Sequence, residues 1–318
     1  MSIKVFSDCG SYNNGYRDPE KPMFGSIGVV VLNDNDEIIY KNARVFEDKT
    51  NNYIYDYAVI IGVDGAGNFY KDIETPYLNE IFRNHFLTYN AYVNTPGESA
   101  QGWGSLLHGV KPDKHSLTNS HVKENKYLLD SPYPSIFKVI NAHNPEANLA
   151  SFVHWEPINY GIIEDGINVY KDSKETDFEV KNAVCDYLST NIPTVLFVQF
   201  DEADEAGHEY GYQSEKQYEK LNEIEEYIYA IFESYRQKDI LDKTLFIVTA
   251  DHGGYKDNHG GEKPVEREII LGIYGMTINN SIESDIKIED IAAITLYALG
   301  YEIPDTYSGI VPKNLFKN

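Results

Sequence analysis

The stretch TLFIVTADHGG, residues 244–254, is a short apolar run that ends at a carboxylate and an imidazole. Two further runs have the same form: YAVIIGVD at residues 57–64 and TVLFVQFD at residues 194–201. Unbroken apolar runs of this length are typical of parallel strands that helices cover on both faces. Ligands of such sheets bind beyond the carboxyl ends of the strands, so we expect the three terminal aspartates to meet at one edge.

Segments with helical spacing lie between these runs, which predicts an α/β fold with a mainly parallel central sheet between helices. In residues 215–237, for example, apolar side chains recur every three or four positions with acids and lysines between them, as in an amphipathic helix on a sheet face. The expected helices span residues 76–84, 100–108, 178–189, 215–237 and 288–299.

Residues 1–55 have a different pattern, in which apolar and polar residues alternate and turn signals are frequent. Residues 25–32 and 37–40 flank the polar stretch NDND, which predicts a β-hairpin. We therefore expect a β-rich N-terminal segment over residues 1–55 and a catalytic domain over residues 56–318.

The charge of the chain argues against several classes of partner. There are 27 Lys and Arg against 50 Asp and Glu among 318 residues, a net charge of −23 at neutral pH. A general nucleic-acid binder needs a basic face, and so does a protein that docks on anionic membranes. The two cysteines, Cys9 and Cys185, are too few for a disulfide framework. With no signal peptide and no run of about 20 apolar residues, the sequence predicts a soluble, cytoplasmic protein without membrane contact.

Carboxylates and imidazoles gather just beyond the three apolar runs. The six residues are Asp64, Asp204, His208, Asp251, His252 and His259. Carboxylate oxygen and imidazole nitrogen together suit borderline divalent ions such as zinc and manganese, and six such ligands are enough for two ions. A two-metal site suits phosphoryl transfer, because one ion activates the nucleophile while the other stabilises the leaving oxygen.

These motifs, together with several others, resemble the alkaline phosphatase superfamily and, within it, the type I phosphodiesterase/nucleotide pyrophosphatase branch, over residues 57–318. The matching motifs are IIGVDG at residues 60–65, TPYL at 75–78, Ser99 followed by SLLHG at 105–109, DEAGH at 204–208, TADHG at 249–253 and NHG at 258–260. The resemblance implies two divalent ions, Zn²⁺ or alternatively Mn²⁺. It assigns Asp204, His208 and His259 to one ion and Asp64, Asp251 and His252 to the other.

The resemblance also implies a nucleophile, which in the family lies six positions before the Ser or Thr that opens an SLLTG-like segment. Counting back from Ser105 gives Ser99. At the start of a helix near Ala100, free N–H groups and the helix dipole favour an alkoxide and a bound phosphate. An N-cap role for Ser99 is compatible with this one, and Thr95 is the alternative nucleophile. The mechanism that the resemblance implies is in-line attack on phosphorus, which gives a phosphoseryl intermediate.

Departures from the family pattern bear on the substrate. Ser99 is not followed by the Pro and Arg of sulfatases, so sulfatase activity through a formylglycine is not expected. Gly102 stands where many phosphodiesterases of the family have an Asn that holds a phosphate oxygen, which leaves that role to backbone N–H groups, Asn119 or His108. Trp103 is a candidate pocket wall, with a core position as the alternative. The interval between the nucleophile and the second metal motif is too short for the inserted domain of cofactor-independent phosphoglycerate mutases.

The N-terminal segment has a second, weaker resemblance. FSDCGS at residues 6–11, GSIGVVV at 25–31 and TNN at 50–52 are similar to the opening strands and the following turn of ribonuclease H. Asp8 matches the first magnesium-binding carboxylate of that family, but Tyr55 stands where a glutamate is expected. Residues 1–55 are therefore interpreted as a truncated unit without nuclease chemistry.

The sequence thus predicts a two-metal phosphohydrolase that cleaves a small-molecule phosphodiester or phosphomonoester through a phosphoseryl intermediate on Ser99. The alternatives are a catalytically silent binding or scaffold protein of the same fold, another activity of the superfamily (sulfatase, phosphonate hydrolase or mutase), or a nuclease. Two dications outweigh the three ligand aspartates, which gives the loaded centre of this acidic chain a local charge of about +1 that attracts an anionic ester. The oligomeric state stays open.

Overall fold

The chain forms two compact units, residues 1–52 and 53–318. The computed structural model describes residues 3–7, 27–32, 38–41, 54–282 and 285–317. In the first unit, β1 (Ile3–Ser7), β2 (Ile27–Leu32) and β3 (Ile38–Lys41) form an antiparallel sheet in that order. β2 and β3 are the strands of the expected hairpin. Asp8 and the TNN turn, on which the ribonuclease resemblance rests, lie outside the described residues.

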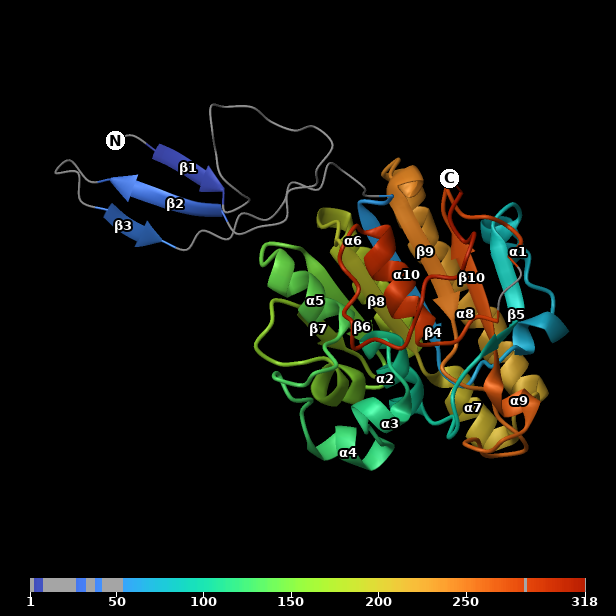
Figure 1. The fold of residues 1–318 in the computed structure, drawn as a ribbon. Coiled ribbons are helices and arrows are strands. Elements are labelled where there is room, and N and C mark those ends of the chain that lie inside the picture. Colours follow the sequence, from blue (N-terminus) through green and yellow to red (C-terminus); the bar gives the residue numbers. More distant parts are fainter. Residues whose placement is uncertain (1–2, 8–26, 33–37, 42–53, 283–284, 318) are drawn as a thin grey trace. The chain divides into compact units, whose positions relative to one another are not determined.

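The second unit is built around one seven-stranded sheet with the order β5-β10-β9-β4-β8-β6-β7 (Figure 1). Its strands are β4 (Tyr57–Val63), β5 (Phe86–Tyr92), β6 (Leu149–Val153), β7 (Tyr170–Ser173), β8 (Val195–Phe200), β9 (Thr244–Thr249) and β10 (Glu268–Tyr274). β10 runs antiparallel to both of its neighbours, whereas the other pairs in this sheet are parallel. The sheet is therefore mixed but mainly parallel, and the expected α/β class is confirmed.

The three apolar runs form neighbouring strands at the centre of this sheet. β4 lies between β8 and β9, and Ile60 is paired with Phe197 on one side and Ile247 on the other. β8 and β9 are buried along their whole length, as expected for strands covered on both faces. Because the three strands are parallel and in register, their carboxyl ends reach the same edge of the sheet.

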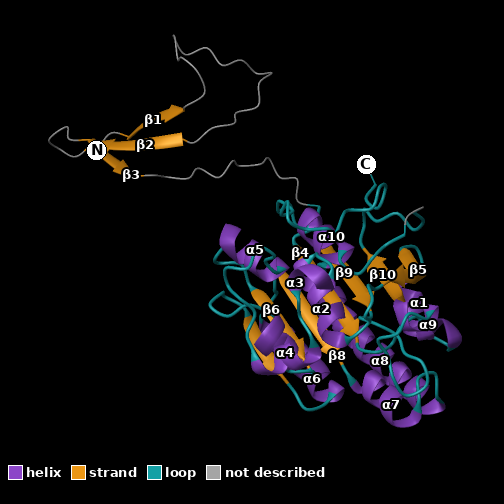
Figure 2. Cartoon of the chain, turned by 60° about the horizontal axis from the view of Figure 1, so that its bottom comes forward, coloured by secondary structure: helices purple, strands orange, loops and turns teal. Residues whose placement is uncertain are grey.

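Helices cover both faces of the sheet (Figures 1 and 2). On one face, three helices contact one another: α2 (Ser99–His108), α5 (Ile136–His143) and α10 (Asp290–Ala298). On the other, α8 (Glu215–Gln237) contacts both α1 (Pro76–Phe82) and α6 (Asp177–Thr190). Shorter helices are α3 (Pro112–His115), α4 (Asn119–Glu124), α7 (Glu202–Tyr210) and α9 (Pro264–Arg267), with single turns at Phe69–Asp72, Ile158–Ile162 and Leu241–Lys243.

The expected helices are present with ends shifted by a few residues, and α8 has the expected bounds. The α8 helix begins where the Ser214 hydroxyl accepts a hydrogen bond from the Gln217 N–H, and its apolar stripe, including Ile224 and Ile228, is buried. Within the described part of the chain, no helix combines the length and the apolar character needed to cross a membrane.

Candidate active site

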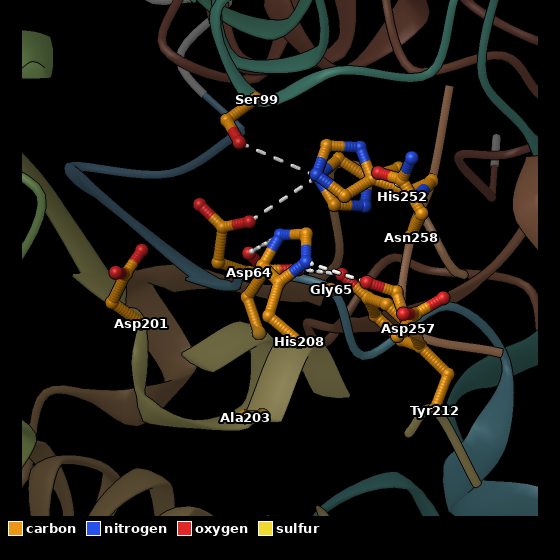
Figure 3. Close-up of polar contacts among 12 residues, drawn as sticks. Asp64, Gly65, Ser99, Asp201, Ala203, His208, Tyr212, His252, Asp257 and Asn258 are labelled. Carbon is orange, nitrogen blue, oxygen red and sulfur yellow. Dashed lines mark hydrogen bonds and ion pairs between the residues drawn. The ribbon is translucent and has the colours of Figure 1, made fainter. Parts of the chain in front are cut away.

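Two buried carboxylates, of Asp64 and Asp251, and the imidazole of His252 converge beyond the ends of β4 and β9. Figure 3 shows Asp64 beside His252. The Nε2 atom of His252 lies 3.4 Å from Oδ1 of Asp64 and 3.3 Å from Oδ2 of Asp251. These two carboxylate oxygens are buried and have no hydrogen-bond partner among the described residues. Leaving such atoms unpaired costs free energy, which a bound cation would offset. The three side chains therefore fit a divalent metal ion.

The protein fixes the second oxygen of each of these carboxylates. Oδ2 of Asp64 accepts hydrogen bonds from Trp103 Nε1 at 2.9 Å and Gln199 Nε2 at 3.2 Å. Oδ1 of Asp251 accepts from the backbone N–H of Gly65 at 3.2 Å and from that of His252 at 3.0 Å. Each carboxylate is thus oriented through one oxygen and presents the other to the cluster, as metal-ligating carboxylates do.

A second cluster lies beside the first and is formed by Asp204, His252 and His259, whose ligand atoms lie within 4.8 Å of one another. His208, one turn after Asp204 on α7, places its Nε2 atom 3.2 Å from Oδ2 of Asp204. The ring of His259 stacks on that of His252 at a centroid distance of 3.9 Å and lies 5.0 Å from that of His208. All six residues that the sequence predicts as metal ligands therefore gather in one place.

The tautomer of the three histidines follows from their second ring nitrogen. Nδ1 lies 2.9 Å from the Asp257 carbonyl oxygen in His208, 3.0 Å from that of Gly253 in His252, and 3.0 Å from that of Gly97 in His259. A carbonyl oxygen only accepts, so Nδ1 donates, and the lone pair of each ring in its neutral form is on Nε2. This is the arrangement expected of metal-ligating histidines.

The electrostatics of the protein alone also favour a bound cation. Burial, and after it the neighbouring Asp251 charge, raises the pKa of Asp64 well above its ordinary value. Burial and then the Asp204 charge raise the pKa of Asp251 in the same way. Burial, followed by the nearby His259, lowers the pKa of His252 to about 3. Burial thus disfavours the ionised form of both carboxyls, and a bound dication would offset this cost.

Ser99 lies next to the first cluster. It is the first residue of α2, it is buried, and its Oγ is 3.4 Å from Nε2 of His252. The amino end of α2, with its N–H groups and positive dipole end, is thus near the carboxylates (Figure 3). Thr95, the alternative nucleophile, is exposed in the loop before the helix.

Packing explains the glycine at position 102. A Cβ atom on Gly102 would lie 2.7 Å from the backbone oxygen of Asp251 and 2.8 Å from its Cβ. No side chain fits there, so this position has no room for the Asn that holds a phosphate oxygen in many phosphodiesterases of the family. Instead, Asn119 reaches the start of α2 from α4, where its Oδ1 accepts the Ala100 N–H at 2.8 Å. Its Nδ2 makes no hydrogen bond to any described residue and can donate to a ligand.

Trp103 and His108 are both buried and hydrogen-bonded within the protein. Trp103 is fully buried and donates to Asp64, so its position is the core alternative and its effect on the site is to orient a metal ligand. His108 is also fully buried, and its two nitrogens face the carbonyl oxygens of Tyr133 and Ile162 at 2.9 and 3.1 Å. Neither ring is left to line a pocket or to bind a phosphate oxygen.

Gln199 is a residue of the site that the sequence motifs do not include. Its Oε1 accepts the backbone N–H groups of His154 and Trp155, and its Nε2 donates to both Asp64 and Asp201. Gln199 is fully buried. The sequence does contain a signal for it, because it is the only amide in the run TVLFVQFD. Asp201 is linked to Asp64 through the Gln199 amide.

Comparisons with known proteins agree with this geometry. The model of the family "type I phosphodiesterase/nucleotide pyrophosphatase" matches residues 58–271. GPI ethanolamine phosphate transferase 1 of Saccharomyces cerevisiae is 26% identical over 152 residues, and the match spans 41% of this chain but 16% of the yeast protein.

Two solved structures share the fold. An inactive form of murine ectonucleotide pyrophosphatase/phosphodiesterase 5 in complex with AMP is 12% identical, with a TM-score of 0.63 over 82% of this chain and 100% of the murine one. The phosphonate monoester hydrolase of Agrobacterium radiobacter is also 12% identical, with a TM-score of 0.61 over 80% and 76% of the two chains.

Proposed function

Because the chain belongs to the type I phosphodiesterase/nucleotide pyrophosphatase family, we propose that it is a two-metal phosphohydrolase that cleaves a small-molecule phosphodiester or phosphomonoester. The observation that carries the proposal is the pair of unpartnered buried carboxylate oxygens that meet Nε2 of His252, with Ser99 Oγ 3.4 Å from the same nitrogen. A nucleophile beside a cation site is the arrangement that phosphoryl transfer needs.

In this proposal, one ion is held by Asp64, Asp251 and His252, and the other by Asp204, His208 and His259. The donor set of carboxylate oxygens and imidazole nitrogens favours zinc, with manganese as the alternative. When bound, the ions supply positive charge that stabilises the attacking alkoxide and neutralises the phosphate.

The chain's own residues then perform a double displacement. The hydroxyl proton of Ser99 leaves to solvent, Oγ forms a bond to phosphorus, and the bond from phosphorus to the leaving oxygen breaks on the opposite side. The leaving oxygen takes up a proton from water, and the enzyme is left as a phosphoseryl intermediate. Asn119 Nδ2 and the amino end of α2 hold the oxygens of the phosphoryl group. Water then attacks phosphorus and gives up a proton, the bond from phosphorus to Ser99 Oγ breaks, and Oγ takes up a proton, which releases the product and restores the serine.

The test is a comparison of kcat/KM for a bis-aryl phosphodiester, an aryl phosphate and an aryl sulfate with the chelated protein and with added Zn²⁺ or Mn²⁺. We expect metal-dependent hydrolysis of at least one phosphate ester, little sulfate hydrolysis, and a phosphoserine at Ser99 in protein quenched during turnover. If the protein binds two ions and turns over none of these esters, the alternative of a catalytically silent binding protein is favoured.

A further inference from the structure

Tyr212 lies in the connection between α7 and α8 and touches both segments that carry the ligands of the second proposed ion, Asp204 and His208 on α7 and His259 in the loop after β9. Its side chain is buried, and its hydroxyl donates a hydrogen bond to Oδ1 of Asp204 at 2.5 Å (Figure 3). Its backbone N–H donates to the carbonyl oxygen of Lys256 at 2.6 Å, in the loop that leads to His259. One residue thus joins the helix of Asp204 to the loop of His259.

The two oxygens of Asp204 have different surroundings: Oδ1 is held by the protein, and Oδ2 faces the proposed metal site. Oδ1 accepts from Tyr212, and the backbone of Gly65 closes its other side, because a Cβ atom on Gly65 would lie 2.3 Å from it. Oδ2 is the oxygen near Nε2 of His208, at 3.2 Å. A carboxylate held in this way offers one oxygen to a metal ion, as Asp64 and Asp251 do.

The ring of Tyr212 is fixed by close packing as well as by its hydroxyl. A Cβ atom on Gly207 would lie 2.7 Å from this ring, and one on Gly254 would lie 2.4 Å from it. Gly207 belongs to the DEAGH motif and Gly254 directly follows the TADHG motif, so a glycine in or beside each motif leaves space for the same ring. The rings of His208 and His259 meet it edge-on at 5.7 and 6.3 Å.

We propose that Tyr212 is a positioning residue that makes Asp204 a one-oxygen ligand and sets the distance between the ligands of α7 and His259. This proposal rests on the two-metal site of the proposed function. Without the phenol, the Asp204 carboxylate can rotate, and its buried Oδ1 loses a charge-assisted hydrogen bond. Loss of such a hydrogen bond to a metal ligand typically weakens metal binding about 10- to 100-fold.

The experiment measures stepwise Zn²⁺ dissociation constants by competition with a chelator, on the full chain and without substrate. Tyr212→Phe removes only the hydroxyl, and Tyr55→Phe is the control, because it removes another largely buried tyrosine hydroxyl that is bonded to Thr277 instead. We expect Tyr212→Phe to weaken one Zn²⁺ site about 10- to 100-fold and to leave the other within about twofold. Tyr55→Phe should leave both sites unchanged.

A purely structural role would lower the unfolding temperature of Tyr212→Phe and leave both dissociation constants at their wild-type values, which would overturn the proposal. Equal weakening of both sites would overturn it too. Gly254→Ala is a second variant that keeps the hydroxyl but displaces the ring, and the same single site should weaken. If the wild type binds two ions and hydrolyses no ester, the proposed function fails while the role of Tyr212 stands; if it binds no ion, both fail.

Discussion

The hydroxyl oxygen of Ser99 lies 3.4 Å from Nε2 of His252, an imidazole that also lies within 3.4 Å of carboxylate oxygens from two different strands. The Gly253 carbonyl, which lies 3.0 Å from Nδ1 of His252, orients the ring so that Nε2 faces Ser99. The relationship joins the amino end of α2 to the ends of β4 and β9, and so it connects a candidate nucleophile to a candidate metal centre.

Replacement of this nucleophile should abolish turnover and spare metal binding. We expect Ser99→Ala to lower kcat/KM at least about 10³-fold, because no other hydroxyl takes its place, while the Zn²⁺ content stays at the wild-type value. Ser105→Ala is a matched control on the same helix, since its buried hydroxyl is bonded to His115 instead. Retention of activity within tenfold in Ser99→Ala would exclude a phosphoseryl intermediate.

Removal of metal should destabilise the protein most at neutral and alkaline pH. The pKa of Asp64 and of Asp251 is raised in the folded protein, chiefly by burial, so these carboxyls bind protons more tightly when folded than when unfolded. Their ionisation therefore lowers the free energy of unfolding as pH rises above about 4. The unfolding temperature of the chelated protein should fall accordingly, and Zn²⁺ should restore it by binding the folded state.

Asp251→Asn tests the same effect by removing one of the buried charges instead of adding a metal ion. The amide oxygen can still accept the N–H groups of Gly65 and His252, but the buried charge is gone. We expect the chelated variant to unfold at a higher temperature than the chelated wild type, by about 2–4 °C per kcal/mol gained, and its shift with Zn²⁺ to be strongly reduced. An unchanged Zn²⁺ shift would remove Asp251 from the set of metal ligands.

The apolar runs made the edge of the sheet predictable, because a strand that is buried on both faces is an unbroken run of apolar residues, and each of these runs ends at an aspartate. Six of the site residues follow these runs directly, within two turns of helix or within a short loop, so their meeting could be inferred. The positions of Trp103 and His108 could not, since sequence does not tell whether a ring on α2 faces the sheet or the solvent. Nor does it tell that Gly102 has room for no side chain, which depends on how closely α2 packs on Asp251.

A buried ion pair next to the site should make stability depend on pH. His154 Nδ1 lies 2.9 Å from Oδ1 of Asp177, whose two oxygens also accept the N–H groups of Asp201 and Glu202 at the start of α7. Burial lowers the pKa of His154, but the hydrogen bond and charge of Asp177 outweigh it and raise this pKa to about 9. The stability that protonated His154 contributes is therefore fully present at pH 6.5 and disappears as pH rises through 9, while the raised pKa of Asp177 limits the pair at acid pH.

His154→Gln should reveal this dependence in urea unfolding at fixed pH. We expect a loss of about 1–3 kcal/mol at pH 6 and a much smaller loss at pH 10. His143→Gln is the control, because Nδ1 of His143 bonds the Val139 carbonyl and no acid. An equal loss at both values of pH would mean that His154 is neutral in the folded protein.

The N-terminal unit should be dispensable for catalysis. Residues 53–318 form a compact unit that contains all the candidate ligands and Ser99. A chain that begins at residue 53 should therefore keep kcat/KM and metal content within about threefold of the full chain. A loss of more than tenfold with the fold intact would show that residues 1–52 take part in the reaction or in substrate binding.

Asn119 offers a way to separate helix capping from substrate binding. Its Oδ1 holds the Ala100 N–H at the start of α2, and its Nδ2 is left to donate to a phosphoryl oxygen. Asn119→Asp keeps the acceptor for Ala100 but replaces the donor with a negative oxygen that repels the phosphate. We expect it to lower kcat/KM about 10²- to 10³-fold, the cost of losing one donor to a developing charge, with unchanged unfolding temperature and Zn²⁺ affinity.

Asn119→Ala loses both contacts, so it should lower kcat/KM and also the unfolding temperature. If Asn119→Asp turns over substrate like the wild type, the side chain caps α2 and does no more, and the phosphoryl oxygens are held by backbone N–H groups alone.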